Sequence, residues 1–159
     1  MSNKNVQDLL STAIAMAACA HEGVLDRGGN AYITHPIRIM MRLRTNDAEL
    51  MSIAILHDTI EDAPDIVSFK ALIDAGFSTR VINALQLLTH SNDDSYEDYI
   101  KKIATNKDAL RVKLEDLKDN SDLTRLKGVT QKDFNRVIKY QKAYTYLSRI
   151  LTASEEVDY

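Results

Sequence analysis

The chain has 159 residues, enough for one ordinary domain with a core of its own. It is 45% hydrophobic and 27% charged, and its net charge of −3 gives no electrostatic basis for a nucleic-acid or anionic-membrane surface. No run approaches the ~18–20 apolar residues of a membrane span, and the N-terminus lacks the basic-then-apolar order of a signal peptide. We therefore expect a cytoplasmic protein without nucleic-acid or membrane partners.

Apolar residues recur at helical spacing along most of the chain, while strand-like alternation is scarce. A first helix is predicted over 5–22, with Cys19 as a buried small apolar residue, and a glycine-rich loop follows at 23–34. A helix begins near Thr34, and a nearly all-apolar helix with Asp47 as N-cap is predicted over 48–61. The remaining predicted helices span 68–75, 78–88, 95–105, 107–120 and 130–152. The pattern predicts one all-α domain over 1–159, with a core at about 5–152 and an acidic C-terminal tail.

Four ionisable residues stand at the end of the apolar 48–61 segment, in LHDTIED. On a continuous helix His57 and Glu61 share one face, and Asp58 and Asp62 share the next. A neutral imidazole beside a carboxylate is a common pair of divalent-metal ligands.

A metal needs further ligands, and the sequence offers His35 before a proline and Asp116 in another apolar stretch. This mixed nitrogen and oxygen set suits Mn²⁺, Fe²⁺ or a catalytic Zn²⁺, with metal-activated water attacking phosphorus as the natural chemistry. A histidine inside a helix is more often a satisfied structural residue, so the pattern alone leaves a metal site and ordinary core histidines both open.

Five segments in order resemble the HD-domain phosphohydrolases, and in particular the hydrolase domain of the RelA/SpoT family and its stand-alone small alarmone hydrolases. The segments are AHEG (20–23), GGNAYITHP (28–36), AILHDTIEDA (54–63), FSTRVINALQLLT (77–89) and VKLEDLKDN (112–120). The resemblance implies an all-helical HD bundle of about seven to nine helices around one metal ion, typically Mn²⁺. It implies a (p)ppGpp or (p)ppApp 3′-pyrophosphohydrolase, in which metal-activated water attacks the 3′-diphosphate of the alarmone and releases pyrophosphate.

The same resemblance assigns roles to individual residues. The implied metal ligands are His35, His57, Asp58 and Asp116, and the implied acidic pair that places or deprotonates the attacking water is Glu61 and Asp62. The implied substrate contacts are Arg27, Tyr32 and Asn120. From residue type and sequence context alone, Arg27 could equally be a solvated loop charge and Tyr32 a packing residue.

The chain departs from the family pattern at positions expected to face the substrate. Asp26 stands where a basic residue is usual, and Lys118 and Asp119 interrupt the segment that follows Asp116. These changes keep two alternatives open: another HD nucleotide phosphohydrolase, such as a nucleotidase or a 2′- or 3′-nucleotide phosphatase, and a non-catalytic nucleotide-binding regulator. We expect a small nucleotide as the ligand and no synthetase domain on this chain, and the sequence leaves the oligomeric state open.

Overall fold

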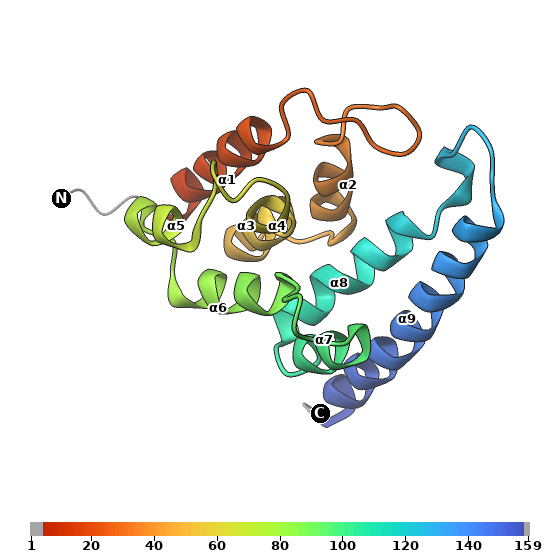
Figure 1. The fold of residues 1–159 in the computed structure, drawn as a ribbon. Coiled ribbons are helices and arrows are strands. Elements are labelled where there is room, and N and C mark those ends of the chain that lie inside the picture. The colour runs from red at the N-terminus through yellow and green to blue at the C-terminus, as the bar shows by residue number, and fades with distance from the viewer. Residues whose placement is uncertain (1–4, 158–159) are drawn as a thin grey trace.

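The computed structural model describes residues 5–157, which form a helical bundle (Figure 1). Within these residues there are nine α-helices and one short 3-10 helix. Their bounds are α1 Val6–Ala20, α2 Thr34–Arg42, α3 Ala48–Leu56, α4 Thr59–Asp62, α5 Phe69–Ala75, α6 Thr79–Leu88, α7 Tyr96–Ile103, α8 Lys107–Asn120, η1 Leu123–Arg125 and α9 Gln131–Val157. The predicted all-α class is confirmed.

Helix α3 lies at the centre of the bundle, where it contacts α1, α2, α6 and α8 (Figure 1). Asp47 caps it as predicted, accepting the backbone N–H groups of Glu49 and Leu50. Leu50, Ile53 and Ile55 are fully buried, which explains why this helix is apolar almost all round. The C-terminal end of α3 therefore lies in the middle of the core.

The predicted continuous helix over 48–61 is wrong, because α3 ends at Leu56 and α4 begins only at Thr59. Two side chains occupy the carbonyl groups that a continuing helix would need for its own backbone. The Nδ1 atom of His57 donates to the carbonyl of Ala54 over 2.8 Å, and the hydroxyl of Thr59 donates to that of Leu56, also over 2.8 Å. His57 and Asp58 form the short turn between α3 and α4, and both keep right-handed helical backbone angles.

Helix α1 buries a narrower stripe than its composition suggests. Ala13 and Ala17 are fully buried, but Ile14 is partly exposed, and Cys19 is exposed. The prediction of a buried Cys19 is wrong, because two residues at about 100° each separate it from Ala17 and turn it to the opposite side.

Helices α8 and α9 form a long antiparallel pair, with α9 along the outer edge of the bundle (Figure 1). Helix α8 has the predicted bounds, whereas α9 continues through the acidic segment to Val157. Asp158 and Tyr159 of the predicted tail lie outside the described residues. No helix within 5–157 is both long and apolar enough to cross a membrane.

The glycine-rich loop between α1 and α2 is folded into a hairpin-like turn that reaches toward η1 (Figure 1). One carboxyl oxygen of Asp26 accepts the backbone N–H groups of Gly28 and Asn30, each at 2.9 Å. Gly28 is buried against the backbone of Arg125, where an added Cβ would lie 2.4 Å from the carbonyl oxygen. The loop therefore packs closely on η1, and it leads directly into α2.

Candidate metal centre and its pocket

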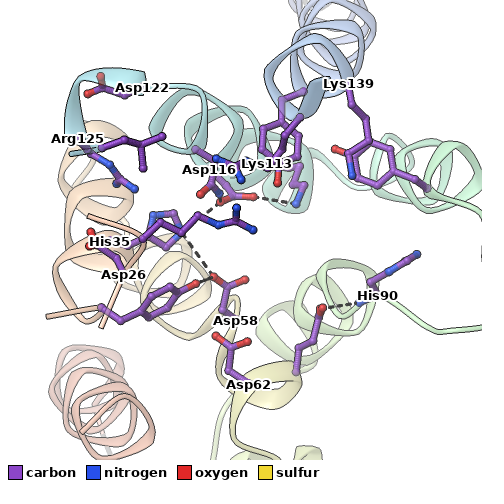
Figure 2. Close-up of a pocket in the computed structure, with 18 of the residues that line it drawn as sticks. Asp26, His35, Asp58, Asp62, His90, Lys113, Asp116, Asp122, Arg125 and Lys139 are labelled. Carbon is purple, nitrogen blue, oxygen red and sulfur yellow. Dashed lines mark hydrogen bonds and ion pairs between the residues drawn. The ribbon is translucent and has the colours of Figure 1, made fainter. Parts of the chain in front are cut away.

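Three elements bring the four predicted metal ligands around one point, and Figure 2 shows three of these residues, His35, Asp58 and Asp116. His35 comes from α2, His57 and Asp58 from the turn after α3, and Asp116 from α8. The Nε2 atom of His35 lies 3.5 Å from Asp58 Oδ2 and 3.3 Å from Asp116 Oδ1, and the Nε2 atom of His57 lies 3.0 Å and 3.7 Å from the same two oxygens. Ligand atoms of His35, His57 and Asp58 all lie within 4.8 Å of one another.

Both imidazoles are held so that Nε2 faces this point. The Nδ1 atom of His57 donates to the Ala54 carbonyl, and the Nδ1 atom of His35 lies 2.7 Å from a carboxyl oxygen of Asp119. The second nitrogen of each ring is buried and, among the described residues, has no hydrogen bond of acceptable geometry. In the neutral ring these contacts place the proton on Nδ1 and leave the Nε2 lone pair free, as metal-binding histidines require.

The carboxylates of the site favour positive charge at its centre. Burial alone would lower the pKa of His35, but the nearby carboxylates of Asp116, Asp119 and Asp58 raise it to about 11. Burial likewise opposes the charge on His57, and Asp58 and Asp116 still raise its pKa to about 9. Against the effect of burial, His57 and His35 lower the pKa of Asp58, while Lys113 and the same histidines lower that of Asp116.

This arrangement fits a divalent cation. Two buried imidazole nitrogens with no hydrogen bond inside the described range 5–157, together with two ionised carboxylates, are an N₂O₂ donor set that suits Mn²⁺, Fe²⁺ or catalytic Zn²⁺. Asp58 is about one quarter exposed, whereas His35, His57 and Asp116 are nearly enclosed, so the site opens to the pocket on the Asp58 side.

The predicted acidic pair lies one turn after Asp58, on α4, and both residues line the pocket. Glu61 accepts the backbone N–H of His90 over 3.2 Å (Figure 2). Burial and the charges of Asp58 and Glu61 raise the pKa of Asp62 to about 6. A carboxylate with such a pKa is a better proton acceptor near neutral pH than an ordinary aspartate.

The metal-ligand cluster forms one end of a cavity of about 580 Å³. Figure 2 shows Asp58 and Asp62 on one side of it and Lys113 and Lys139 across from them. Its basic side chains come from the glycine-rich loop, α8, η1 and α9: Arg27, Lys113, Arg125, Arg136 and Lys139. Its aromatic side chains are Tyr32, Tyr96, Tyr99 and Tyr140. A cavity that joins a predicted metal-ligand cluster to several basic side chains matches a ligand that carries phosphate groups beyond the metal.

The three predicted substrate contacts all line this cavity, but two of them also touch predicted metal ligands. The Tyr32 hydroxyl donates to Asp58 Oδ2 over 2.6 Å, and the Asn120 amide donates to Asp116 Oδ1 over 2.5 Å. These bonds orient the same oxygens that face the imidazoles. Arg27 is largely exposed, with Asp133 of α9 3.9 Å away, so its guanidinium stands at the rim.

The cavity contains residues that sequence reasoning missed. Arg136, Lys139 and Tyr140 come from α9, and one guanidinium nitrogen of Arg136 is buried without a hydrogen-bond partner in the described part of the chain. Their spacing of three and four residues is a helix-face signal. That signal alone does not separate a pocket wall from a solvated face, and only the packing of α9 on α7 and α8 makes the difference.

Two of the departures from the family pattern do not face the cavity. Lys118 pairs with Glu115 and lies over the Tyr144 ring, and the Asp119 carboxylate is fully buried beneath the metal cluster. The expectation that these two positions face the substrate is therefore wrong. Asp26 does line the cavity, although one of its oxygens is used by the loop backbone.

The comparisons with known proteins agree with an all-helical bundle. A solved structure of a metazoan orthologue of SpoT, described as hydrolysing ppGpp, superposes with a TM-score of 0.73 over 96% of each chain at 20% sequence identity. The two chains therefore share a fold.

Two bacterial proteins are similar in sequence. A guanosine-3′,5′-bis(diphosphate) 3′-pyrophosphohydrolase of Vibrio cholerae is 29% identical over 150 aligned residues, covering 87% of this chain and 21% of the relative. The bifunctional (p)ppGpp synthase/hydrolase SpoT of Escherichia coli K12 is 42% identical over 57 residues, covering 35% of this chain and 8% of the relative. The chain thus spans about a fifth or less of the length of these relatives, and no family model matches it.

Proposed function

We propose that this chain is a metal-dependent 3′-pyrophosphohydrolase of (p)ppGpp- or (p)ppApp-type alarmones, the nucleotides of the stringent response. The observation that carries the proposal is the pair of buried His35 and His57 Nε2 atoms, both without a hydrogen bond to any described residue, facing Asp58 and Asp116 at the end of a cavity that also holds basic side chains. The shared fold and the similar relatives described as ppGpp hydrolases support the same activity.

The residues of the cavity suit a nucleotide with two phosphate-bearing positions. A divalent cation held by His35, His57, Asp58 and Asp116 would polarise a phosphoryl oxygen and lower the pKa of a bound water. Arg125, Arg136 and Lys139 lie in the wall beyond the metal cluster, where they can neutralise further phosphate charge. Tyr96 and Tyr140 line the same cavity, with Lys139 over both rings, and supply aromatic surface for a purine.

The acidic pair divides into two roles in this proposal. Glu61, held by the His90 N–H, positions the attacking water, and Asp62, with its raised pKa, accepts the proton. Proton transfer of this kind contributes about 10²–10⁴-fold to rate. Glu61→Gln and Asp62→Asn should therefore both keep metal binding, with the larger loss of kcat in Asp62→Asn.

The test is a product analysis with the protein loaded with Mn²⁺. Purified protein is offered ppGpp, pppGpp, ppApp and simple nucleotides, and pyrophosphate and orthophosphate are measured separately. Pyrophosphate release from ppGpp or ppApp, absent in Asp58→Ala, is the expected result. Release of orthophosphate alone would refute the pyrophosphohydrolase and favour a nucleotide phosphatase on the same site.

The phosphatase is the second candidate because of one observation, the acidic Asp26 in the cavity wall where a basic residue was expected. A carboxylate there disfavours a densely charged phosphate nearby and favours a nucleobase or a less charged nucleotide. A non-catalytic nucleotide-binding regulator is the third candidate, and it leaves the pocket-lining Glu61 and Asp62 without a role. Tight nucleotide binding by the metal-loaded protein with no turnover of any nucleotide would favour it.

Mn²⁺ is our proposed ion within the class that the donor set allows. We further propose that the described helices belong to one HD-type domain, since their buried residues form one continuous core from Ala13 to Leu147. A small nucleotide is the proposed partner, and a cytoplasmic location remains a prediction.

A further inference from the structure

The most completely buried carboxylate of the site belongs to Asp119, a residue to which sequence reasoning gave no metal role. Its side chain has no exposed surface, and it lies at the C-terminal end of α8, three residues after the ligand Asp116. Its Oδ2 atom lies 2.7 Å from the Nδ1 atom of His35. It touches the ring on the side opposite to the Nε2 atom that faces the cluster.

Three arginines surround this carboxylate. Arg38 donates from Nε and Nη2 over 2.8 and 2.9 Å to the two oxygens, and Arg42 Nη1 lies 2.9 Å from Oδ1. Arg125 donates from Nη1 to Oδ2, the oxygen that also meets His35. The two bonds from Arg38 and the bond from Arg125 fix the carboxylate in the orientation in which Oδ2 meets the imidazole.

From this geometry we propose that Asp119 is the positioning residue of the metal centre, which fixes the ring of His35 and the tautomer that presents Nε2 to the cation. The inference rests on the proposed metal-dependent function. Carboxylates behind metal-binding histidines typically contribute about 10–100-fold to metal affinity, because they orient the ring and make it a stronger donor.

A purely structural role of Asp119 predicts a different effect of its loss. If Asp119 served only to neutralise the arginines, its loss would lower stability and leave metal affinity unchanged. Arg42 provides the matched control, because it contacts Asp119 through Oδ1 alone and does not line the cavity. Arg42→Gln disturbs the same buried charge cluster without touching the contact to His35.

The experiment measures the Mn²⁺ dissociation constant by calorimetry for the wild type, Asp119→Asn and Arg42→Gln, with thermal unfolding of each. We expect a dissociation constant about 10–100-fold weaker in Asp119→Asn and within about twofold of the wild type in Arg42→Gln. Equal affinity in Asp119→Asn and the wild type would overturn the inference while leaving the proposed function intact. No Mn²⁺ binding by the wild type would overturn both.

A second measurement decides the matter if Asp119→Asn does not fold. In wild-type protein labelled with ¹⁵N-histidine and loaded with diamagnetic Zn²⁺, the ring of His35 should carry a slowly exchanging proton on Nδ1. A proton on Nε2 of His35 instead would mean that Nδ1 is the ligand atom, and the proposed role of Asp119 would be wrong.

Discussion

Gly28 gives the sharpest test of how the glycine-rich loop supports the site. A Cβ added there would lie 2.4 Å from the backbone oxygen of Arg125, 3.1 Å from Asn30 Nδ2 and 3.2 Å from Asp26 Oδ1. Real Cβ contacts essentially never fall under 3.0 Å, so Gly28→Ala must separate the loop from η1 by at least 0.6 Å. The first of these contacts is with backbone, so no side-chain rotation relieves it.

The displacement has two expected consequences. Overpacking of this kind costs about 1–3 kcal/mol, which in a domain of this size corresponds to a fall in Tm of roughly 2–12 °C. The loop also carries Tyr32, whose hydroxyl holds Asp58 at 2.6 Å, and Arg27 at the rim. A misplacement approaching 1 Å can cost on the order of 10²-fold in rate, so we expect kcat/KM to fall by about 10–100-fold.

The assay is pyrophosphate release from ppGpp together with thermal unfolding, and Gly128→Ala is the control. Gly128 is exposed, and an added Cβ there meets nothing within 4 Å. The control should keep both Tm and kcat/KM. If Gly28→Ala behaves like Gly128→Ala in both measurements, the close packing of loop and η1 is wrong. If it loses only Tm, the loop does not transmit its position to the metal centre.

Three further predictions concern charge. Mn²⁺ at about 100 times its dissociation constant should stabilise the wild type by about 2.7 kcal/mol, which corresponds to a rise in Tm of roughly 5–11 °C. Asp58→Ala should remove this rise in Tm. A full rise in Asp58→Ala would disprove the role of Asp58 as a ligand. The pKa of Asp62 is raised in the folded state to about 6, so its stabilising contribution is complete below about pH 4 and is lost as the pH rises through 6. Asp62→Asn should therefore raise the free energy of unfolding at pH 7.5 by about 1 kcal/mol after screening by solvent, and its Tm should rise accordingly. The gain in stability should be smaller at pH 5, and an equal gain at both pH values would contradict this sign. Arg80 bonds to Asp47, Glu49 and Asp108 far from the cavity. Arg80→Met should therefore lower Tm without changing kcat/KM. A change in kcat/KM would show that this cluster is coupled to the site.

The sequence by itself determined the helical class and most helix positions, because the period of apolar residues and caps such as Asp47 are local signals. It also singled out His35, His57, Asp58 and Asp116 as a set, although 81 residues separate the first from the last. That grouping came from residue chemistry and from the ordered family-like segments. Periodicity carries no information about which helices meet.

Only the tertiary structure decided how these side chains work. The break after Leu56 depends on bonds from His57 and Thr59 to backbone carbonyls, which a periodic pattern does not encode. Asp119 read as a departure from a motif, yet it is a buried acceptor for His35, because α2 and η1 bring three arginines to one carboxylate. The basic wall of the cavity likewise exists because α9 packs on α7 and α8. Local sequence determines which face of a helix is polar, whereas the packing of distant helices determines what that face meets.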